Sequence, residues 1–472
     1  MCESGEIGRR AGLRIQFPNR SGGSSPFSRT TLKKEWSVMS ASNPITFIFK
    51  PSHEQFGIAT ITIPKEYVQA LYLQASQCQQ SELHTMGFSR GNTPLSYINE
   101  NFQPHLIEHG KEFFFKYFVL RTLYTELFKQ KILLAGDPFL QDISLSPDHG
   151  GIFTFSLTLT QPMALGGWKR IPFKAPKRKN YKDLDRQVEH FLRDEEIAMK
   201  NTKPGIINIG DWINFSLQLL DKHKKPIWDA KEYVWLKIGD EESDSPFQTL
   251  FLDKKVGTTF ISDSICLQEY FSSRLDTHYL FAVTIIDHLP QSYFCIEHFK
   301  HHFRIKQPKE VHQKLIEIFS YRNDISQRRA TVEESLRALL SKHSFTIQQH
   351  VLLRQQEAIL KLIHSNPDYP VYKMQSDFRE KIMLLAEKQV KENIFTHQFA
   401  LHENIAVNNT DIKGYLNLNS RPRTSEFIYF EPPFTKHLGY EVPLSATLLS
   451  LCCLKEKTLN YAIHHLTKVK PA

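Results

Sequence analysis

A short segment bounded by glycine and proline holds the residues best suited to contact another molecule. Its two glycines tolerate positive φ and let the chain reverse sharply, and its proline fits the first turn of a following helix. The reversal exposes one aromatic ring, which suits an apolar cleft, and one guanidinium, which suits phosphate or carboxylate. An ordinary connecting loop is the alternative, because glycine and proline often mark loops. The segment reads Gly87-Phe88-Ser89-Arg90-Gly91-Asn92-Thr93-Pro94.

No established catalytic motif accompanies this segment. The sequence contains no Gly-x-Ser-x-Gly, no Walker loop, no dinucleotide fingerprint and no His-Glu-x-x-His. The triplet His298, His301 and His302 has residue types that ligate metals. Surface histidines beside Lys300 are the favoured interpretation, because no Cys or Asp cluster lies near them. We therefore predict neither a metal site nor a cofactor.

Composition limits the class of protein. The 472 residues suggest roughly three domains, and 41% apolar with 23% charged residues is ordinary for a globular chain. The net charge of +9 favours anionic partners such as RNA, although the charge is dispersed. The six cysteines form no Cys-x-x-Cys, which fits reduced thiols in a cytosol. No run approaches the ~18 apolar residues of a membrane helix, so we expect a cytoplasmic protein without a membrane segment.

The N-terminal third predicts a disordered tail followed by one α+β domain. Residues 1–38 are basic and rich in Gly and Ser, without periodicity, and Met39 is an alternative start to Met1. A basic targeting arm is the other interpretation of this tail. Over 39–160, apolar spacing predicts strands, then a helix before the glycine-rich segment, a long helix after it and a closing strand. The expected elements are 45–49, 58–63, a helix from Tyr67, 113–128 and 151–160.

The rest of the chain divides into a link, a strand-rich part and a helical part. Residues 161–205 combine a basic stretch with a short helix at about 184–199, and a solvated linker is favoured over an RNA contact. Residues 206–290 alternate as strands at 212–219, 233–238 and 279–286, with a polar turn at 221–226. From 291 to 472 the apolar spacing is helical, with a last helix at about 445–466.

The segment Gly-Phe-x-x-Gly-x-x-Pro resembles the ribosome-docking signature of bacterial trigger factor, and the order of the later segments also resembles that family. The resemblance implies a multidomain α+β protein: a ribosome-binding domain (39–160), a linker (161–205), an FKBP-like isomerase domain (206–290) and an all-α chaperone domain with helical arms (291–472). It also implies a ribosome-associated chaperone that assists folding and export. Implied partners are the exit-tunnel protein and rRNA of the large ribosomal subunit and nascent polypeptides, with homodimers off the ribosome and no ATP. A dedicated FKBP-type isomerase and a periplasmic folding factor are the alternatives.

The resemblance also implies an isomerase pocket. A prolyl isomerase needs no acid, base or metal, because an apolar aromatic pocket that prefers the twisted amide lowers the rotation barrier. The candidate residues are Phe215, Phe247, Tyr270 and Phe281, for which barrel core is the alternative. The family's Phe-Glu-Gly-Gly turn is Trp228-Asp229-Ala230-Lys231 in this chain, and its Ile-Pro-Gly-Phe is Asp244-Ser245-Pro246-Phe247. We therefore predict weak isomerase activity at best.

Two further family features are present with changes. Ser89 stands where the docking loop commonly has Arg, and Asn92 stands where it commonly has Lys, so we predict reduced ribosome affinity. Residues 345–354 and 378–405 resemble the arm helices, whose scattered apolar patches bind unfolded chains weakly and reversibly.

Overall fold

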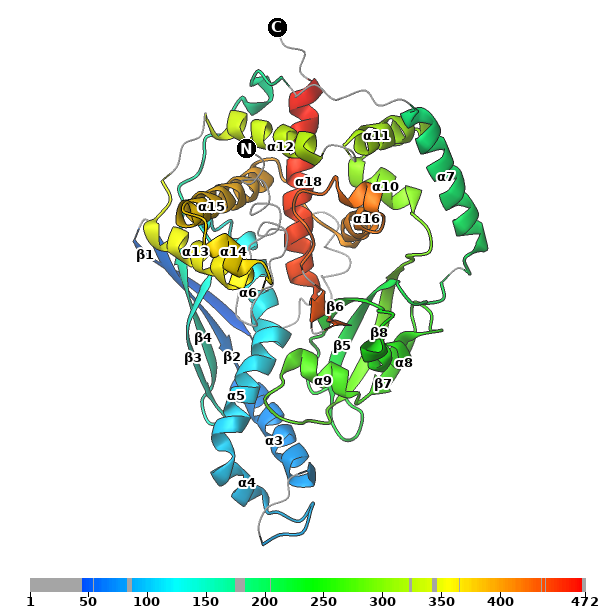
Figure 1. The fold of residues 1–472 in the computed structure, drawn as a ribbon. Coiled ribbons are helices and arrows are strands. Elements are labelled where there is room, and N and C mark those ends of the chain that lie inside the picture. The colour runs from blue at the N-terminus through cyan, green and yellow to red at the C-terminus, as the bar shows by residue number, and fades with distance from the viewer. Residues whose placement is uncertain are drawn as a thin grey trace.

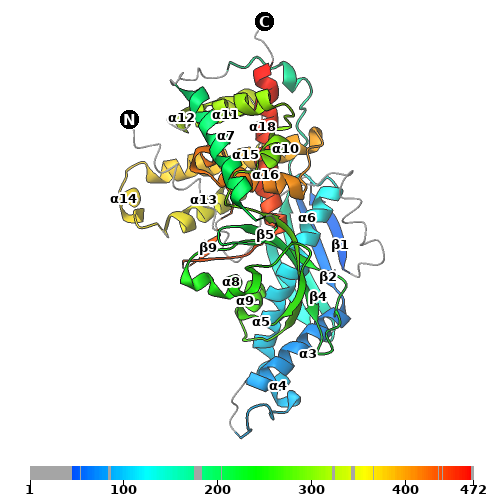
Figure 2. The same cartoon turned by 90° about the vertical axis from the view of Figure 1, so that its right-hand side faces the viewer.

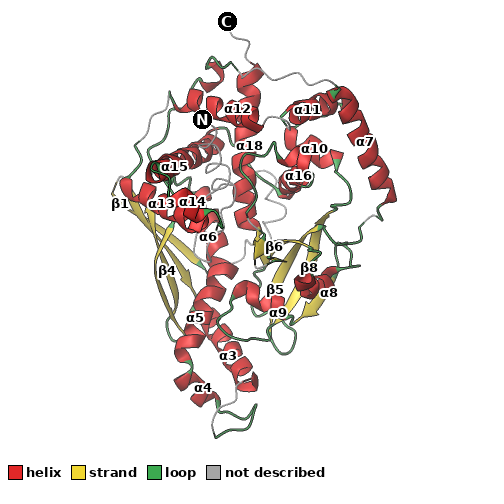
Figure 3. Cartoon of the chain, viewed as in Figure 1, coloured by secondary structure: helices red, strands yellow, loops and turns green. Residues whose placement is uncertain are grey.

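The computed structural model describes residues 45–53, 55–82, 87–174, 183–203, 205–321, 325–341, 346–364, 366–433, 435–437 and 439–468. The expectations for the tail 1–38, for Met39 as a start and for part of the basic stretch, including 177–179 and Lys182, lie outside these residues. The described chain is a mixed α/β structure with two larger antiparallel sheets and many helices (Figures 1 and 3). None of its described helices is long and apolar enough to cross a membrane.

A four-stranded antiparallel sheet forms the first unit, in the order β1-β2-β4-β3. Alternation of apolar and polar residues gives each strand one buried face, as at Ala59, Ile61 and Ile63 of β2. Helices α3 and α5 and the following helical turns cover that face (Figure 1). The strands are β1 (Thr46–His53), β2 (Phe56–Ile63), β3 (Phe139–Ser146) and β4 (Gly150–Thr158).

The helices of this unit flank the glycine-rich segment. Helix α3 (Lys65–Glu82) leads to it, and α4 (Leu95–Asn101) follows it. The predicted long helix is a continuous run with a π turn in its middle. It comprises α5 (Gln103–Phe114), η2 (Phe115–Val119) and α6 (Leu120–Lys129). Most of its aromatic side chains are buried in the hydrophobic core, where they contact residues of both sheets.

The second sheet has five antiparallel strands in the order β11-β6-β5-β8-β7. Two small helices, α8 (Ser245–Phe251) and α9 (Ile265–Phe271), lie beside it. The fifth strand comes from residues 444–445, which lie outside the predicted range 206–290. The strands are β5 (Trp212–Leu220), β6 (Glu232–Lys237), β7 (Thr259–Ser262), β8 (Leu280–Leu289) and β11 (Leu444–Ser445).

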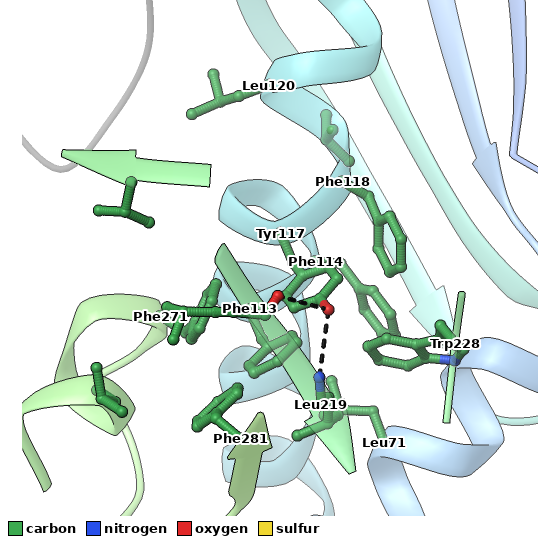
Figure 4. Close-up of a cluster of buried hydrophobic side chains, with 14 of the residues drawn as sticks. Leu71, Phe113, Phe114, Tyr117, Phe118, Leu120, Leu219, Trp228, Phe271 and Phe281 are labelled. Carbon is green, nitrogen blue, oxygen red and sulfur yellow. Dashed lines mark hydrogen bonds between the residues drawn. The ribbon is translucent and has the colours of Figure 1, made fainter. Parts of the chain in front are cut away.

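The two sheets share one hydrophobic core. Aromatic rings of the α5–η2 run pack against Trp228, Phe271 and Phe281 of the second unit (Figure 4). The Tyr117 ring reaches between them, and its hydroxyl bonds to the backbone of β5. Domains that the sequence predicts as 39–160 and 206–290 are therefore joined by buried aromatic contacts.

The remaining helices surround α18 (Ala446–Lys468), whose inward side chains are buried along its length (Figure 1). Short elements η3 (Trp168–Arg170), η4 (Glu242–Asp244), β9 (Lys436–His437) and β10 (Tyr440–Glu441) complete the structure. The helices are α7 (Leu184–Asn201), α10 (Ile296–Phe303), α11 (Pro308–Ser320), α12 (Ile325–Leu340), α13 (Gln349–His364), α14 (Tyr369–Lys373), α15 (Phe378–His402), α16 (Asn409–Asn419) and α17 (Pro422–Ser425).

The described part of the predicted linker is packed rather than solvated. Trp168 is buried, and its Nε1 donates to Glu403 Oε1 over 2.7 Å. Helix α7 packs against α11, and Glu195 of α7 accepts both Arg421 Nε (2.6 Å) and Nη2 (2.9 Å). The two arginine bonds fix the helix to the C-terminal part of the chain.

Candidate functional site

The glycine-rich loop is the part of the molecule that projects furthest beyond α3 and α4 (Figures 1 and 2). Gly87 has φ 92° and Gly91 has φ 84°. A Cβ would meet no atom within 4 Å at either position, so the backbone conformation, and not crowding, favours glycine there. Both reversals fall where the sequence pattern placed them.

Hydrogen bonds within the loop hold its shape. Asn92 donates from its backbone N to Ser89 O (3.0 Å) and from Nδ2 to Ser89 Oγ (2.8 Å). Gln80 of α3 donates to Thr93 O over 2.6 Å, and Thr93 is buried. The two residues that depart from the family pattern thus bond to each other, so this chain uses them to stiffen the turn.

The loop presents a ring and a cation to solvent. The Phe88 side chain is 37% exposed, and its ring leans on Tyr97 with centroids 5.4 Å apart. Arg90 is exposed, and its Nε donates to Ser81 O over 3.3 Å. Pro94 directly precedes α4, as expected for a helix start. A rigid tip with an exposed ring and guanidinium can enter an apolar cleft beside phosphates.

The four aromatic residues predicted for an isomerase pocket lie in the shared core. Phe215 and Phe281 have 0% exposure, and Phe247 has 6%. Phe215 packs on Phe251 at 4.8 Å, and Phe281 stacks on Phe271 at 5.4 Å. Side chains without exposed surface cannot touch a peptide in this conformation, so the core alternative describes Phe215 and Phe281.

Tyr270 has a different environment from the other three. It is half-buried, and burial together with the nearby Glu232 of β6 raises the pKa of its hydroxyl. Burial raises the pKa of Glu232 to about 8, and Arg121 opposes that shift. Lys116 donates to the Tyr270 carbonyl over 2.7 Å. Tyr270 therefore lies among charged side chains of β6 and η2, which is a poor environment for one wall of an open apolar pocket.

Exposed apolar side chains gather on the arm formed by α13, α14 and α15. The arm is a helical hairpin that projects from the body and has a small core of its own around Ile359 and Tyr372 (Figure 2). Met374 at its tip is 87% exposed and Val371 is 63% exposed. The full set is Leu353, Leu360, Val371, Met374, Met383 and Leu384.

A second apolar surface lies on the uncovered face of the four-stranded sheet, next to the base of the arm. Its exposed side chains are Ile48, Phe56, Ile58, Phe139 and Ile152. The arm meets this face directly, because the Arg354 guanidinium carbon lies 4.2 Å from the Phe139 ring centroid. His350 of α13 stacks on Phe56 with centroids 5.3 Å apart and lies 2.8 Å from Thr158 Oγ1. The base of the arm therefore lies against the sheet face through Arg354 and His350, and arm and sheet each carry exposed apolar side chains.

Sequence reasoning missed the sheet surface. Its signal is present in β2, where Phe56 and Ile58 share a strand face with two threonines, so apolar residues occur on both faces. Such a strand indicates either a fully buried sheet or an exposed binding face, and only the packing distinguishes them.

The histidine triplet needs one correction. His301 is exposed, as a surface histidine should be, but His302 is buried. Helix α10 turns that side chain toward α16, where Gly414 leaves room for it. Within the described residues, no group of three or more His, Cys, Asp or Glu side chains is placed to hold a metal ion.

Comparison with known proteins adds little to this geometry. No protein-family description matches the chain, and no curated protein matches it. Among solved structures, it is similar to one from a study of promiscuous substrate recognition in folding and assembly by the trigger factor chaperone. The identity is 16% over 89% of this chain and 100% of that chain, with a TM-score of 0.33. A score this low does not establish a shared fold, so any function depends on this chain's own residues.

Proposed function

We propose that this protein is a trigger-factor-type chaperone that docks on the large ribosomal subunit through residues 87–94 and holds nascent polypeptides on its arm and sheet surface. The observation that carries the proposal is the presence of eleven exposed apolar side chains on two elements that contact each other, six on the arm and five on the sheet face. Unfolded chains expose apolar side chains without a fixed shape, and scattered apolar contacts bind them weakly and reversibly.

The placement of the loop supports the same function. The loop and the arm project from different parts of the molecule (Figures 1 and 2), so docking through one leaves the other accessible. The exposed ring of Phe88 and the guanidinium of Arg90 match the chemistry of a ribosomal contact, in which protein supplies apolar surface and rRNA supplies phosphate. The sequence resemblance of the loop points to the same partner.

Ribosome docking is tested by co-sedimentation with vacant ribosomes at two salt concentrations. Phe88→Ala with Arg90→Ala removes the ring and the cation of the loop, and we expect it to abolish co-sedimentation. Phe139→Ala with Arg354→Ala is the control, because it removes one exposed ring and one half-buried guanidinium far from the loop. Unchanged co-sedimentation of the loop variant would reject the docking assignment, as would equal losses in both variants.

Client binding is tested by suppression of aggregation of a chemically denatured reporter protein. Val371→Ser, Met374→Gln and Leu384→Gln together remove three exposed apolar side chains from the arm. If each of these side chains contributes about 1 kcal/mol when a client chain covers it, the triple variant should bind the reporter protein up to about 100-fold more weakly and suppress its aggregation less.

The control for the arm removes three exposed apolar residues elsewhere. Leu73→Gln, Ile197→Gln and Met199→Gln change side chains that are each about half exposed on α3 and α7. We expect this control to suppress aggregation like the unchanged protein. If the two triple variants lose equal activity, general surface hydrophobicity, and not the arm, explains the binding.

A further inference from the structure

An open cavity of about 960 Å³ with several charged side chains lies among α10, α16, α18 and the loop before α16, away from the docking loop and from the exposed apolar side chains of arm and sheet. Small-molecule sites in proteins commonly have volumes in this range. Seven charged side chains line it, five of them cationic and two anionic, so its net charge is positive. The cations are Lys300, Arg304, Lys306, Lys413 and Lys457, and the carboxylates are Glu297 and Asp411.

Both acidic side chains of the cavity form ion pairs with neighbouring cations. Asp411 Oδ2 accepts the backbone N–H of Asn408 over 2.9 Å and closes the capping box of α16. Its Oδ1 lies 2.7 Å from Lys457 Nζ and 3.2 Å from His301 Nε2. Glu297 pairs with Lys300 at 2.7 Å. Each carboxylate is paired with a lysine, and within the described residues no group of three or more His, Cys, Asp or Glu side chains is placed here to hold a metal ion, so we do not interpret the cavity as a metal site.

The cationic side chains are only partly neutralised. Lys413 pairs with Asp287 of β8 at 2.9 Å, so three of the five cations, with Lys300 and Lys457, are in ion pairs. Arg304 and Lys306, both exposed at the cavity, form no ion pair with any described residue. The guanidinium carbon of Arg304 lies 5.7 Å from the Tyr461 ring centroid, which positions it without neutralising it.

Neutral donors add to the anionic preference. Burial, reinforced by the neighbouring Lys413, lowers the pKa of His298 to about 4, so its ring is uncharged at pH 7 and can donate one N–H. Asn408 and Thr410 line the same space and carry further polar groups. Cationic and neutral donors around one concave space suit an anion with several acceptor oxygens.

We propose that this cavity binds a small anion with a chain of adjacent phosphates, such as inorganic tripolyphosphate or the triphosphate of a nucleotide. The volume is far larger than one phosphate ion fills, and its five cations come from α10, the segment after it, α16 and α18, which favours an extended anion over a compact one. The site is independent of the proposed chaperone function, and a ligand there acts on the helical body that carries the arm.

Isothermal titration of the full chain with sodium tripolyphosphate, at low ionic strength and without divalent cations, tests the proposal. The variant is Arg304→Asn with Lys306→Gln. Asparagine tolerates the left-handed backbone of residue 304, where φ is 54°. Because neither side chain has an ion-pair partner among the described residues, folding should be unaffected. The charge-matched control is Arg186→Gln with Lys309→Gln, two exposed cations outside the cavity.

We expect saturable one-site binding that the cavity variant weakens at least about tenfold and the control changes by less than about twofold. ATP in place of tripolyphosphate distinguishes the source: equal affinity means that the phosphate chain alone is recognised, and tighter binding means that the nucleoside also contacts the cavity. Absence of saturable binding, or equal losses in both variants, would overturn the proposal. Tighter binding of a hexaglutamate peptide than of tripolyphosphate would overturn it as well, because the site would then recognise acidic peptides.

Discussion

Substitution of Tyr117 by phenylalanine should loosen the joint between the two sheets. The hydroxyl donates to Ala230 O (2.8 Å) and Leu217 O (3.2 Å) and accepts the N–H of Leu219 (3.3 Å). The side chain is fully buried, and Figure 4 shows its bonds to β5. Removing one oxygen leaves buried backbone groups without this partner, at a cost of about 1–2 kcal/mol each, so we expect a loss of about 2–4 kcal/mol.

Hydrogen exchange with mass spectrometry measures this effect locally. In Tyr117→Phe, a peptide covering 212–220 should exchange roughly 30-fold to 1000-fold faster, since each 1.4 kcal/mol is a factor of ten. Tyr67→Phe is the control, because the Tyr67 ring packs on Trp228 at 5.3 Å while its hydroxyl makes no hydrogen bond within the described residues. If both variants exchange this peptide at the rate of the unchanged protein, the hydroxyl does not join the two sheets.

Two further predictions concern pH and catalysis. Burial raises the pKa of Glu392 from 4.5 to about 7, so between these values the folded state binds more protons and the free energy of unfolding falls as pH rises, by about 3 kcal/mol in all. The Tyr429 hydroxyl donates to Glu392 Oε1 over 2.7 Å, and glutamine keeps such an acceptor. Glu392→Gln should therefore raise Tm at pH 8 and leave it nearly unchanged at pH 4. A Tm difference that is the same at both pH values would contradict this. Because Phe215 and Phe281 are fully buried, a protease-coupled prolyl-peptide assay should detect little acceleration, and a rate matching that of an efficient prolyl isomerase would show that the core opens.

Local signals predicted the loop and most of the helices. Gly87, Gly91 and Pro94 act on their own backbone, so the turn and the start of α4 follow from three residues without knowledge of the fold. The periodic segments around Tyr67, 184–199 and 445–466 match α3, α7 and α18 to within a few residues. In each case one apolar face recurs over several turns, and any core would bury it.

Features that depend on long-range packing were not predictable. Strand β3 is an edge strand with only Leu145 buried, and its four apolar residues do not alternate strictly with polar ones, so no strand pattern marks it. The segment 427–430 looks like a strand from its residues, but it forms no strand, because the Phe427 ring lies 3.8 Å from the Arg328 guanidinium and packs among the helices. Likewise, no pattern in the sequence shows that Arg421 binds Glu195, more than two hundred residues away.

The distribution of buried residues separates a stiff part of the molecule from a compliant one. The docking loop joins α3 and α4, which contribute buried side chains such as Leu71 and Ile98 to the core shared by both sheets, and hydrogen bonds from Gln80 and Asn92 hold the loop itself. The arm beyond the sheet is held by a small cluster of its own around Ile359, Tyr372 and Phe378, with a second small cluster at its base. Few buried contacts mean a low free energy of local opening, so the arm can change shape at small cost. A binder of chains without fixed shape benefits from that compliance, whereas a docking tip with one ring and one cation needs the stiffness that the shared core provides.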